Sequence, residues 1–208
     1  MRTLLRVAMA AALLTSPAAA QTGPSFDCAK ASHEVERVIC SDPDLSVLDR
    51  ELAAVYGAAR SGPDMNQARQ AELTARQRHW IDSRNGCGQA SELTACITAS
   101  YGQRILELKT HYTGAAGNGG QISFGPVTYA CDAPVYGLEV VFINGPVVRW
   151  AVVSWEDNAV MLVETLADDG TRYAPSLWGD PFEFWMWHDD ASFTQPGQPA
   201  LGCVRTQG

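Results

Sequence analysis

The chain has 208 residues, of which 46% are hydrophobic and six are cysteines, and it carries 23 acidic and 15 basic side chains. The formal net charge of −8 disfavours nucleic acid and anionic lipid as partners, because both are themselves negatively charged. After residue 20, no apolar stretch approaches the roughly 20 residues that a bilayer-spanning helix requires. We therefore expect a soluble protein without a membrane span.

Residues 1–20 have the three-part form of a secretory signal peptide. Two arginines are followed by an apolar run, Val7–Leu14, and then by small residues that end at Ala20. We expect cleavage near Ala20 and a mature protein that is periplasmic or secreted. The first cysteine, Cys28, lies beyond the cleavage region, so the sequence predicts no lipid anchor.

The remaining charge is unevenly distributed. Residues 21–113 contain 12 acidic and 10 basic side chains, a net charge of −2, whereas residues 114–208 contain 11 acidic side chains and three arginines, a net charge of −8. The acidic second half would attract a basic protein and speed its association. The alternative is that this charge serves solubility alone.

Hydrophobic periodicity predicts four helices in the first half of the mature chain. A short helix is expected around residues 32–40, and a longer one begins at the Asp42-Pro43 cap and ends near residue 61. A third helix runs from about residue 66 to residue 84, and a fourth runs from Ser91 to about residue 108. Together these helices predict a helical module at residues 24–112.

All six cysteines follow the signal peptide, and an even number in an exported chain predicts disulfides. The spacings contain no CxxC pair, which disfavours the alternative of a metal site. If the two long helices pack antiparallel, Cys40 lies near Cys87, which leaves Cys28 to pair with Cys96. Four cysteines allow three connectivities, and this nested pairing is the one we predict.

A glycine-rich stretch, GAAGNGG at residues 114–120, marks a change in hydrophobic period from that of a helix to that of a strand. We place a linker at residues 113–122 and a second module at residues 123–206.

The second module contains short segments of alternating hydrophobicity separated by turn residues, a pattern typical of a small antiparallel barrel or sandwich. If the sheet closes, the first strand lies beside the last and Cys131 can bond to Cys203. The predicted fold class is therefore a disulfide-stapled all-α module followed by a small all-β antiparallel barrel. Strands are expected at residues 127–131, 138–143, 147–154, 159–166, 172–174, 184–188, 192–194 and 201–205.

Four segments of the helical module form a distinctive pattern: FDCAKASHEVERVIC, SDPDLSVLDRELAAVY, RQRHWIDSRNGC and ACITASYGQRILEL, within residues 26–108. They resemble the LprI-type helical domain, a four-cysteine module of exported bacterial proteins. The resemblance covers nearly the whole module. It implies an envelope location and, for some members of that family, inhibition of lysozyme.

Three segments of the second module form another pattern: TYACDAPVYGLEVVF, DDGTRYAP and FEFWMWHDDASF, within residues 128–203. They resemble the MliC/PliC inhibitors of c-type lysozyme. This resemblance implies a barrel that presents two loops to the lysozyme cleft. In that family the Ser of a Ser-Gly-x-x-Tyr motif and the Lys of a Phe-Trp-x-Lys-Gly motif contact the catalytic carboxylates of the enzyme.

In this chain the two loops fall near residues 168–173 and 185–190. The positions that match are Gly170, Tyr173, Phe184 and Trp185. Asp169 replaces the serine, and Trp187 and His188 replace the lysine and the glycine. An aspartate that faces two carboxylates is repelled, so we expect binding through the cationic rim of a lysozyme instead. The candidate partner-binding residues are Asp168, Asp169, Gly170, Arg172, Tyr173, Trp185, Trp187, His188 and Asp189.

Alternation within one strand places Trp185 and Trp187 on one face and Phe184 and Met186 on the other. One pair must therefore point inward, and barrel core is the alternative to a binding face for the tryptophans. His188 with its two neighbouring aspartates lacks the spacing of a metal site. No serine lies in a GxSxG motif, and the cysteines are expected to be oxidised, so we predict no enzyme and no cofactor.

The sequence thus predicts an exported inhibitor that binds and occludes a basic cell-wall lytic enzyme, such as a c-type lysozyme or a related muramidase. The alternative, favoured by the loss of the Ser and Lys, is a non-inhibitory envelope adaptor that binds another exported protein or wall glycan. The sequence leaves the oligomeric state open.

Overall fold

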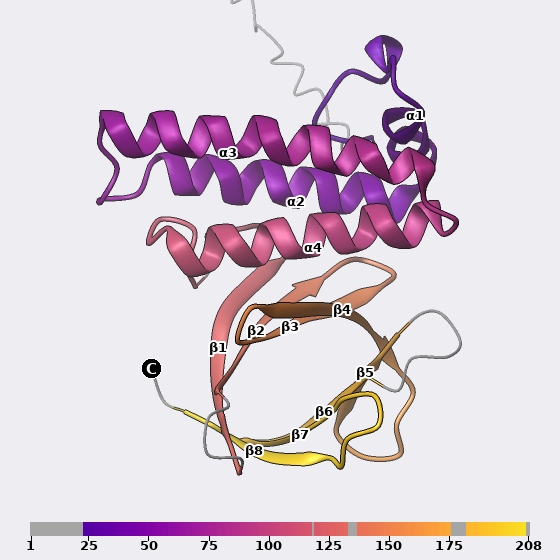
Figure 1. The fold of residues 1–208 in the computed structure, drawn as a ribbon, viewed down its shortest axis with the longest axis vertical. Helices are drawn as coiled ribbons and strands as arrows, with labels where there is room; N and C mark the ends of the chain where they lie inside the picture. The colour runs from indigo at the N-terminus through magenta and orange to yellow at the C-terminus, as the bar shows by residue number, and fades with distance from the viewer. Residues whose placement is uncertain (1–22, 118, 133–136, 176–181, 207–208) are drawn as a thin grey trace, which may run out of the picture.

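The structure, a computed structural model, describes residues 23–117, 119–132, 137–175 and 182–206. The predicted signal peptide and its cleavage site lie outside these residues. Three long helices lie side by side, and the last of them, α4, rests against the outside of a β-barrel (Figure 1). The predicted fold class, a disulfide-stapled helical module followed by a small antiparallel barrel, is confirmed.

The four predicted helices are present. The 18-residue helix α2 begins where the Asp42 side chain accepts hydrogen bonds from the backbone N–H groups of Asp44 and Leu45, with Pro43 in the first turn. Asn66 caps the next long helix through the N–H of Arg69. The helical elements are η1 (Cys28–Lys30), α1 (Glu34–Ser41), α2 (Pro43–Arg60), α3 (Gln67–Asn85), η2 (Gly86–Gln89) and α4 (Leu93–His111).

The predicted disulfide pairing of the helical module is wrong. Cys28 is bonded to Cys40 and Cys87 to Cys96, with sequence separations of 12 and 9 residues. Both bonds lie at the same end of the module, where η2 contacts α1 and α4. The prediction failed because η1 and η2 are short turns, each of which brings a cysteine back to the adjacent helix.

The second module is a closed barrel in which eight antiparallel strands follow one another in chain order and β1 pairs with β8. Cys131 and Cys203 lie opposite each other across that closing pair, and the predicted bond between them is confirmed. The strands are β1 (Ser123–Cys131), β2 (Gly137–Asn144), β3 (Arg149–Trp155), β4 (Asn158–Thr165), β5 (Thr171–Ala174), β6 (Glu183–Trp187), β7 (Asp190–Thr194) and β8 (Leu201–Arg205).

Two of these strands are apolar on both faces. In β2, Val140 and Phe142 point into the barrel, whereas Val141 and Ile143 pack with the helical module. In β3, Trp150 and Val152 face the helices in the same way, and the inward residues alternate with them. The two modules therefore share one hydrophobic core across α4 and the outer face of β2–β4.

Gly102 permits the close contact between α4 and the barrel. A β-carbon placed there would lie 2.4 Å from the Sδ of Met161 and 3.0 Å from a methyl group of Val152. Ordinary packed atoms do not approach so closely, so any side chain at this position forces the two modules apart or displaces their contacts.

We predict that Gly102→Leu lowers the free energy of unfolding by about 1–3 kcal/mol, because the added atoms overpack the junction. The matched control is Gly57→Ala, at a helix position where a β-carbon meets no atom within 4 Å. That change should instead stabilise the protein by about 0.5–1 kcal/mol through helix propensity. Urea unfolding of the oxidised variants measures both. Equal effects of the two changes would show that the junction is not tightly packed.

Two buried ionisable side chains hold the segment between α4 and β1. The fully buried carboxylate of Glu51 on α2 accepts hydrogen bonds from the backbone N–H groups of Gln121, Ile122 and Ser123, and from the Ser123 hydroxyl. Lys109 donates from Nζ to the carbonyl oxygens of residues 115 and 117 at 3.2 and 2.9 Å. Burial lowers the pKa of Lys109, and the negative charge of Glu51 opposes that shift.

We predict that Glu51→Gln destabilises the protein by about 2–4 kcal/mol. The amide replaces one of the two accepting oxygens with an NH2 group, which cannot accept a hydrogen bond from the backbone N–H groups. The control is Glu156→Gln, at an exposed turn between β3 and β4, which should change the unfolding free energy by less than about 0.5 kcal/mol. Denaturant unfolding provides the measurement. A Glu51→Gln variant as stable as the control would contradict this role.

Candidate functional site

The two predicted binding loops lie at the same end of the barrel. Because successive strands are antiparallel, the turn after β4 (residues 166–170) and the turn after β6 (residues 188–189) open at one end. The turn after β3 (residues 156–157) opens at the opposite end. The structure therefore brings together the two segments that the sequence had placed some twenty residues apart.

Trp185 and Trp187 point outward from β6, while Phe184 is fully buried inside the barrel. Both tryptophans are half-buried, and their ring centroids are 5.2 Å apart in an edge-to-face arrangement of 66°. Met186, which alternates with them, packs against the barrel core. The question that the sequence left open is thus answered: the tryptophans form a surface pair rather than core.

Strand register defines what surrounds this tryptophan pair. Trp185 lies between Arg172 on β5 and Ser192 on β7, and Trp187 lies opposite Asp190. Arg172 is paired with Glu183, a neighbour of the tryptophans on the same face. We call the outer surface of β5–β8 around these residues the tryptophan face.

The turn after β4 is fixed against the tryptophan face. Trp185 donates its indole N–H to the carbonyl oxygen of Asp169 at 2.8 Å. Gly170 has a φ of +67°, and a β-carbon there would lie 2.4 Å from the carbonyl oxygen of Met186. Gly170 is therefore required by the backbone path and not as a contact for a partner.

Carboxylates surround the tryptophan face at this end of the barrel. Asp168, Asp169, Asp189 and Asp190 are all exposed. His188 lies in the turn between β6 and β7 with a φ of +58° and is exposed as well. Among the residues that the structure describes, no three acidic, histidine or cysteine side chains are grouped so that they could hold a metal ion.

Tyr173 is the one candidate that lies away from the surface. Its side chain is 4% exposed and points into the barrel, where it packs near the rings of Phe142 and Phe184. Burial raises the pKa of Tyr173 to about 12, with the nearby Glu164 carboxylate adding to the shift. The residue that matches the family motif here supports the barrel and does not contact solvent.

We predict that ionisation of Tyr173 contributes to alkaline unfolding. A phenol that ionises near pH 10 when unfolded and near pH 12 when folded stabilises the native state below pH 10 and loses that contribution as the pH rises to 12. Tyr173→Phe should therefore flatten the decline of the unfolding free energy between pH 10 and pH 12 by up to about 1.4 kcal/mol per pH unit. Urea unfolding at pH 7 and at pH 11 tests this. A decline as steep as that of the unmodified protein would contradict it.

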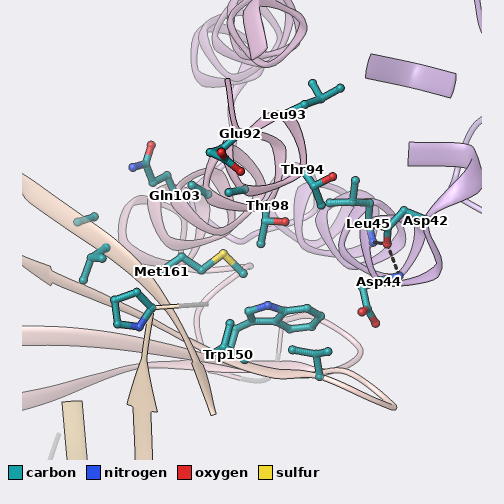
Figure 2. A pocket seen from close by; sticks show the side chains of 17 residues that line it. Asp42, Asp44, Leu45, Glu92, Leu93, Thr94, Thr98, Gln103, Trp150 and Met161 are labelled. Carbon is teal, nitrogen blue, oxygen red and sulfur yellow. Dashed lines mark hydrogen bonds between the residues drawn. The ribbon is translucent and has the colours of Figure 1, made fainter. Parts of the chain in front are cut away.

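The structure also contains a concave region that was not predicted from the sequence. A cleft of about 870 Å³ lies between the helical module and the barrel, walled by the beginnings of α2 and α4 and floored by the outer face of β3–β4. Figure 2 shows Trp150 and Met161 on the barrel side facing Thr94 and Thr98 of α4. The sequence carried one signal that the helices cover part of the barrel. Residues 140–143 and 150–153 are apolar without interruption, which indicates strands that are covered on both faces.

No helix within the described ranges is both long enough and apolar enough to cross a bilayer. The fold and the site together define a class: a disulfide-bonded, two-module protein whose barrel carries an acidic, aromatic surface at one end. Residues 28–108, most of the helical module, match the family described as "Lysozyme inhibitor LprI".

Relatives named "Lipoprotein LprI" occur in Mycobacterium bovis and in Mycobacterium tuberculosis. Each is 29% identical to this chain over 159 residues, which cover 76% of this chain and 74% of the relative. An aligned stretch of that length cannot fit into the 122 residues that precede the barrel, so the similarity extends into the barrel.

These relatives and the three disulfides indicate an exported protein. The family match ends before the barrel, whose resemblance to MliC/PliC inhibitors stays a prediction.

Proposed function

We propose that this protein binds a basic lysozyme, of the c-type or a related muramidase, and inhibits it by covering its cleft with the tryptophan face. The observation that carries the proposal is the outward pair Trp185 and Trp187 surrounded by exposed aspartates. The family match of residues 28–108 supports the same activity, because the family description is that of a lysozyme inhibitor.

Charge supports the choice of partner. The second half of the chain, residues 114–208, has a net charge of −8, and four of its carboxylates lie around the tryptophan face. A field of this sign accelerates encounter with a cationic protein and opposes approach of an anionic one. This contribution weakens as salt screens the charges.

Packing supports the choice of surface. The helices cover β1–β4, so the tryptophan face on β5–β8 is the part of the barrel wall that they leave free. Tryptophan is among the residues that most often dominate the binding energy of an interface. Beside Trp185, the outer face continues through Ser192 to Gly202, and the carboxylate of Asp132 lies over Gly202.

Inhibition would then not use a lysine in the cleft of the enzyme. Trp187 stands where the MliC/PliC motif has its lysine, and Asp169 stands where that motif has its serine. We infer that the aspartates engage basic groups on the rim of the lysozyme cleft while the tryptophans cover it. Substrate is excluded by steric occlusion and not by a contact with the catalytic carboxylates.

We predict that Trp187→Ala weakens lysozyme binding by about 2 kcal/mol, or roughly 30-fold in Kd, and relieves inhibition in parallel. Calorimetry measures the affinity, and the clearing of a bacterial cell suspension measures the inhibition. The control is Ile81→Ala, which removes a partly exposed apolar side chain from α3 and should change neither quantity. Thermal unfolding of both variants verifies that they are folded.

The charge component has its own test on the same assay. Asp168→Lys combined with Asp189→Lys should slow association about tenfold at low salt and flatten its salt dependence. Glu156→Lys combined with Asp157→Lys makes the same change in charge at the opposite end of the barrel and should have a smaller effect. If the unmodified protein fails to bind lysozyme at either salt concentration, the proposal is wrong and the adaptor hypothesis gains support.

A further inference from the structure

The cleft between the two modules is separate from the tryptophan pair. Its floor is the outer surface of β3 and β4, which lie three and two strands away from β6, the strand that carries the two tryptophans. The opposite walls come from the first turns of α2 and the first half of α4 (Figure 2). A molecule in the cleft would touch both modules at once.

The floor and one wall of the cleft are apolar. Leu93 on α4 and Leu45 on α2 face it from the helices, while Trp150, Met161 and Val163 line it from the barrel. The volume of about 870 Å³ is sufficient for several side chains. Binding of an apolar group to such a surface is favourable, because it displaces water from apolar side chains.

The ionisable side chains that line the cleft are all acidic. They are Asp42, Asp44 and Glu92, and no lysine or arginine is among the described residues of the lining. Thr94, Thr98 and Gln103 add hydroxyl and amide groups along α4. The cleft thus combines an apolar floor with a negatively charged rim.

The fold uses only one of the three carboxylates. Asp42 caps α2 through two backbone N–H groups. Glu92 stands at the equivalent position of α4, but its side chain makes no capping hydrogen bond. None of the ion pairs within the described residues includes Asp44, and burial together with the charge of Asp42 raises its pKa.

We propose that this cleft binds a cationic amphipathic segment of a partner protein, with apolar side chains on the floor and lysine or arginine side chains at the rim. Charge complementarity selects this occupant, since an anionic segment would face three carboxylates, of which only Asp42 is engaged by the fold. The threonine and glutamine side chains of α4 are placed to hydrogen-bond the backbone of the bound segment. This surface is separate from the one proposed to cover lysozyme, and a bound segment would also tie the helical module to the barrel.

The test uses the full mature protein and two synthetic peptides of equal length, one built from leucine and lysine and the other from leucine and glutamate. NMR titration should shift the indole N–H resonance of Trp150 and the amide resonances of Thr94 and Thr98 with the lysine peptide. The glutamate peptide should leave them unchanged. Because no lysozyme is present, the result does not depend on the proposed inhibition.

Variants test whether the lysine peptide binds in the cleft. Asp44→Asn combined with Glu92→Gln should weaken the lysine peptide at least tenfold, and Ala99→Phe should block it by filling the cleft. Glu72→Gln combined with Asp82→Asn removes the same amount of charge from exposed positions on α3, a helix that lines no part of the cleft, and should leave the affinity within about twofold. The proposal is overturned if the two charge-removing pairs weaken binding equally, or if the shifted resonances lie outside the cleft.

Discussion

The buried carboxylate of Glu51 determines where the barrel begins. It satisfies three successive backbone N–H groups and one hydroxyl at the start of β1, and Gly120 comes so close to it that a β-carbon there would lie 1.9 Å from its oxygen. The start of β1 is therefore held against α2, and this attachment fixes the direction in which the strand runs. That direction sets β2–β4 against α4 and leaves β5–β8 facing solvent, so both proposed binding surfaces depend on this one acceptor.

The barrel wall is consequently built in two different ways. Over β2–β4 the outer residues are aliphatic or aromatic and are buried by α4, as Val141 and Val152 are. Over β5–β8 the outer residues are the tryptophan pair with polar and acidic neighbours such as Ser192 and Asp190. The hydrophobic contact with the helices thus covers most of the outer face of β2–β4, and the two proposed binding surfaces are the tryptophan face and the cleft beside that contact.

Local signals in the sequence were sufficient to predict most of the fold. Caps such as Asp42-Pro43 and turns such as Asp168-Asp169-Gly170 act within a few residues, and they located the helices and all eight strands. The disulfide pairing failed because it depends on how η1 and η2 turn, which periodicity does not report. Tyr173 was chosen from a motif, although it pairs with Phe184 inside the barrel. The cleft could not be predicted, since it exists only where two modules meet.

Closure of the barrel has a consequence for the order in which the chain folds. The pairing of β1 with β8 places Cys131 beside Cys203, which are 72 residues apart in the sequence. This pairing can form only after the last strand has emerged during export. The helical module is complete at His111 and both of its disulfides are local. While the barrel is still an open sheet, α4 already offers its apolar surface to β2–β4. The outer face of β2–β4 can therefore be covered by α4 before β8 pairs with β1 and the barrel closes.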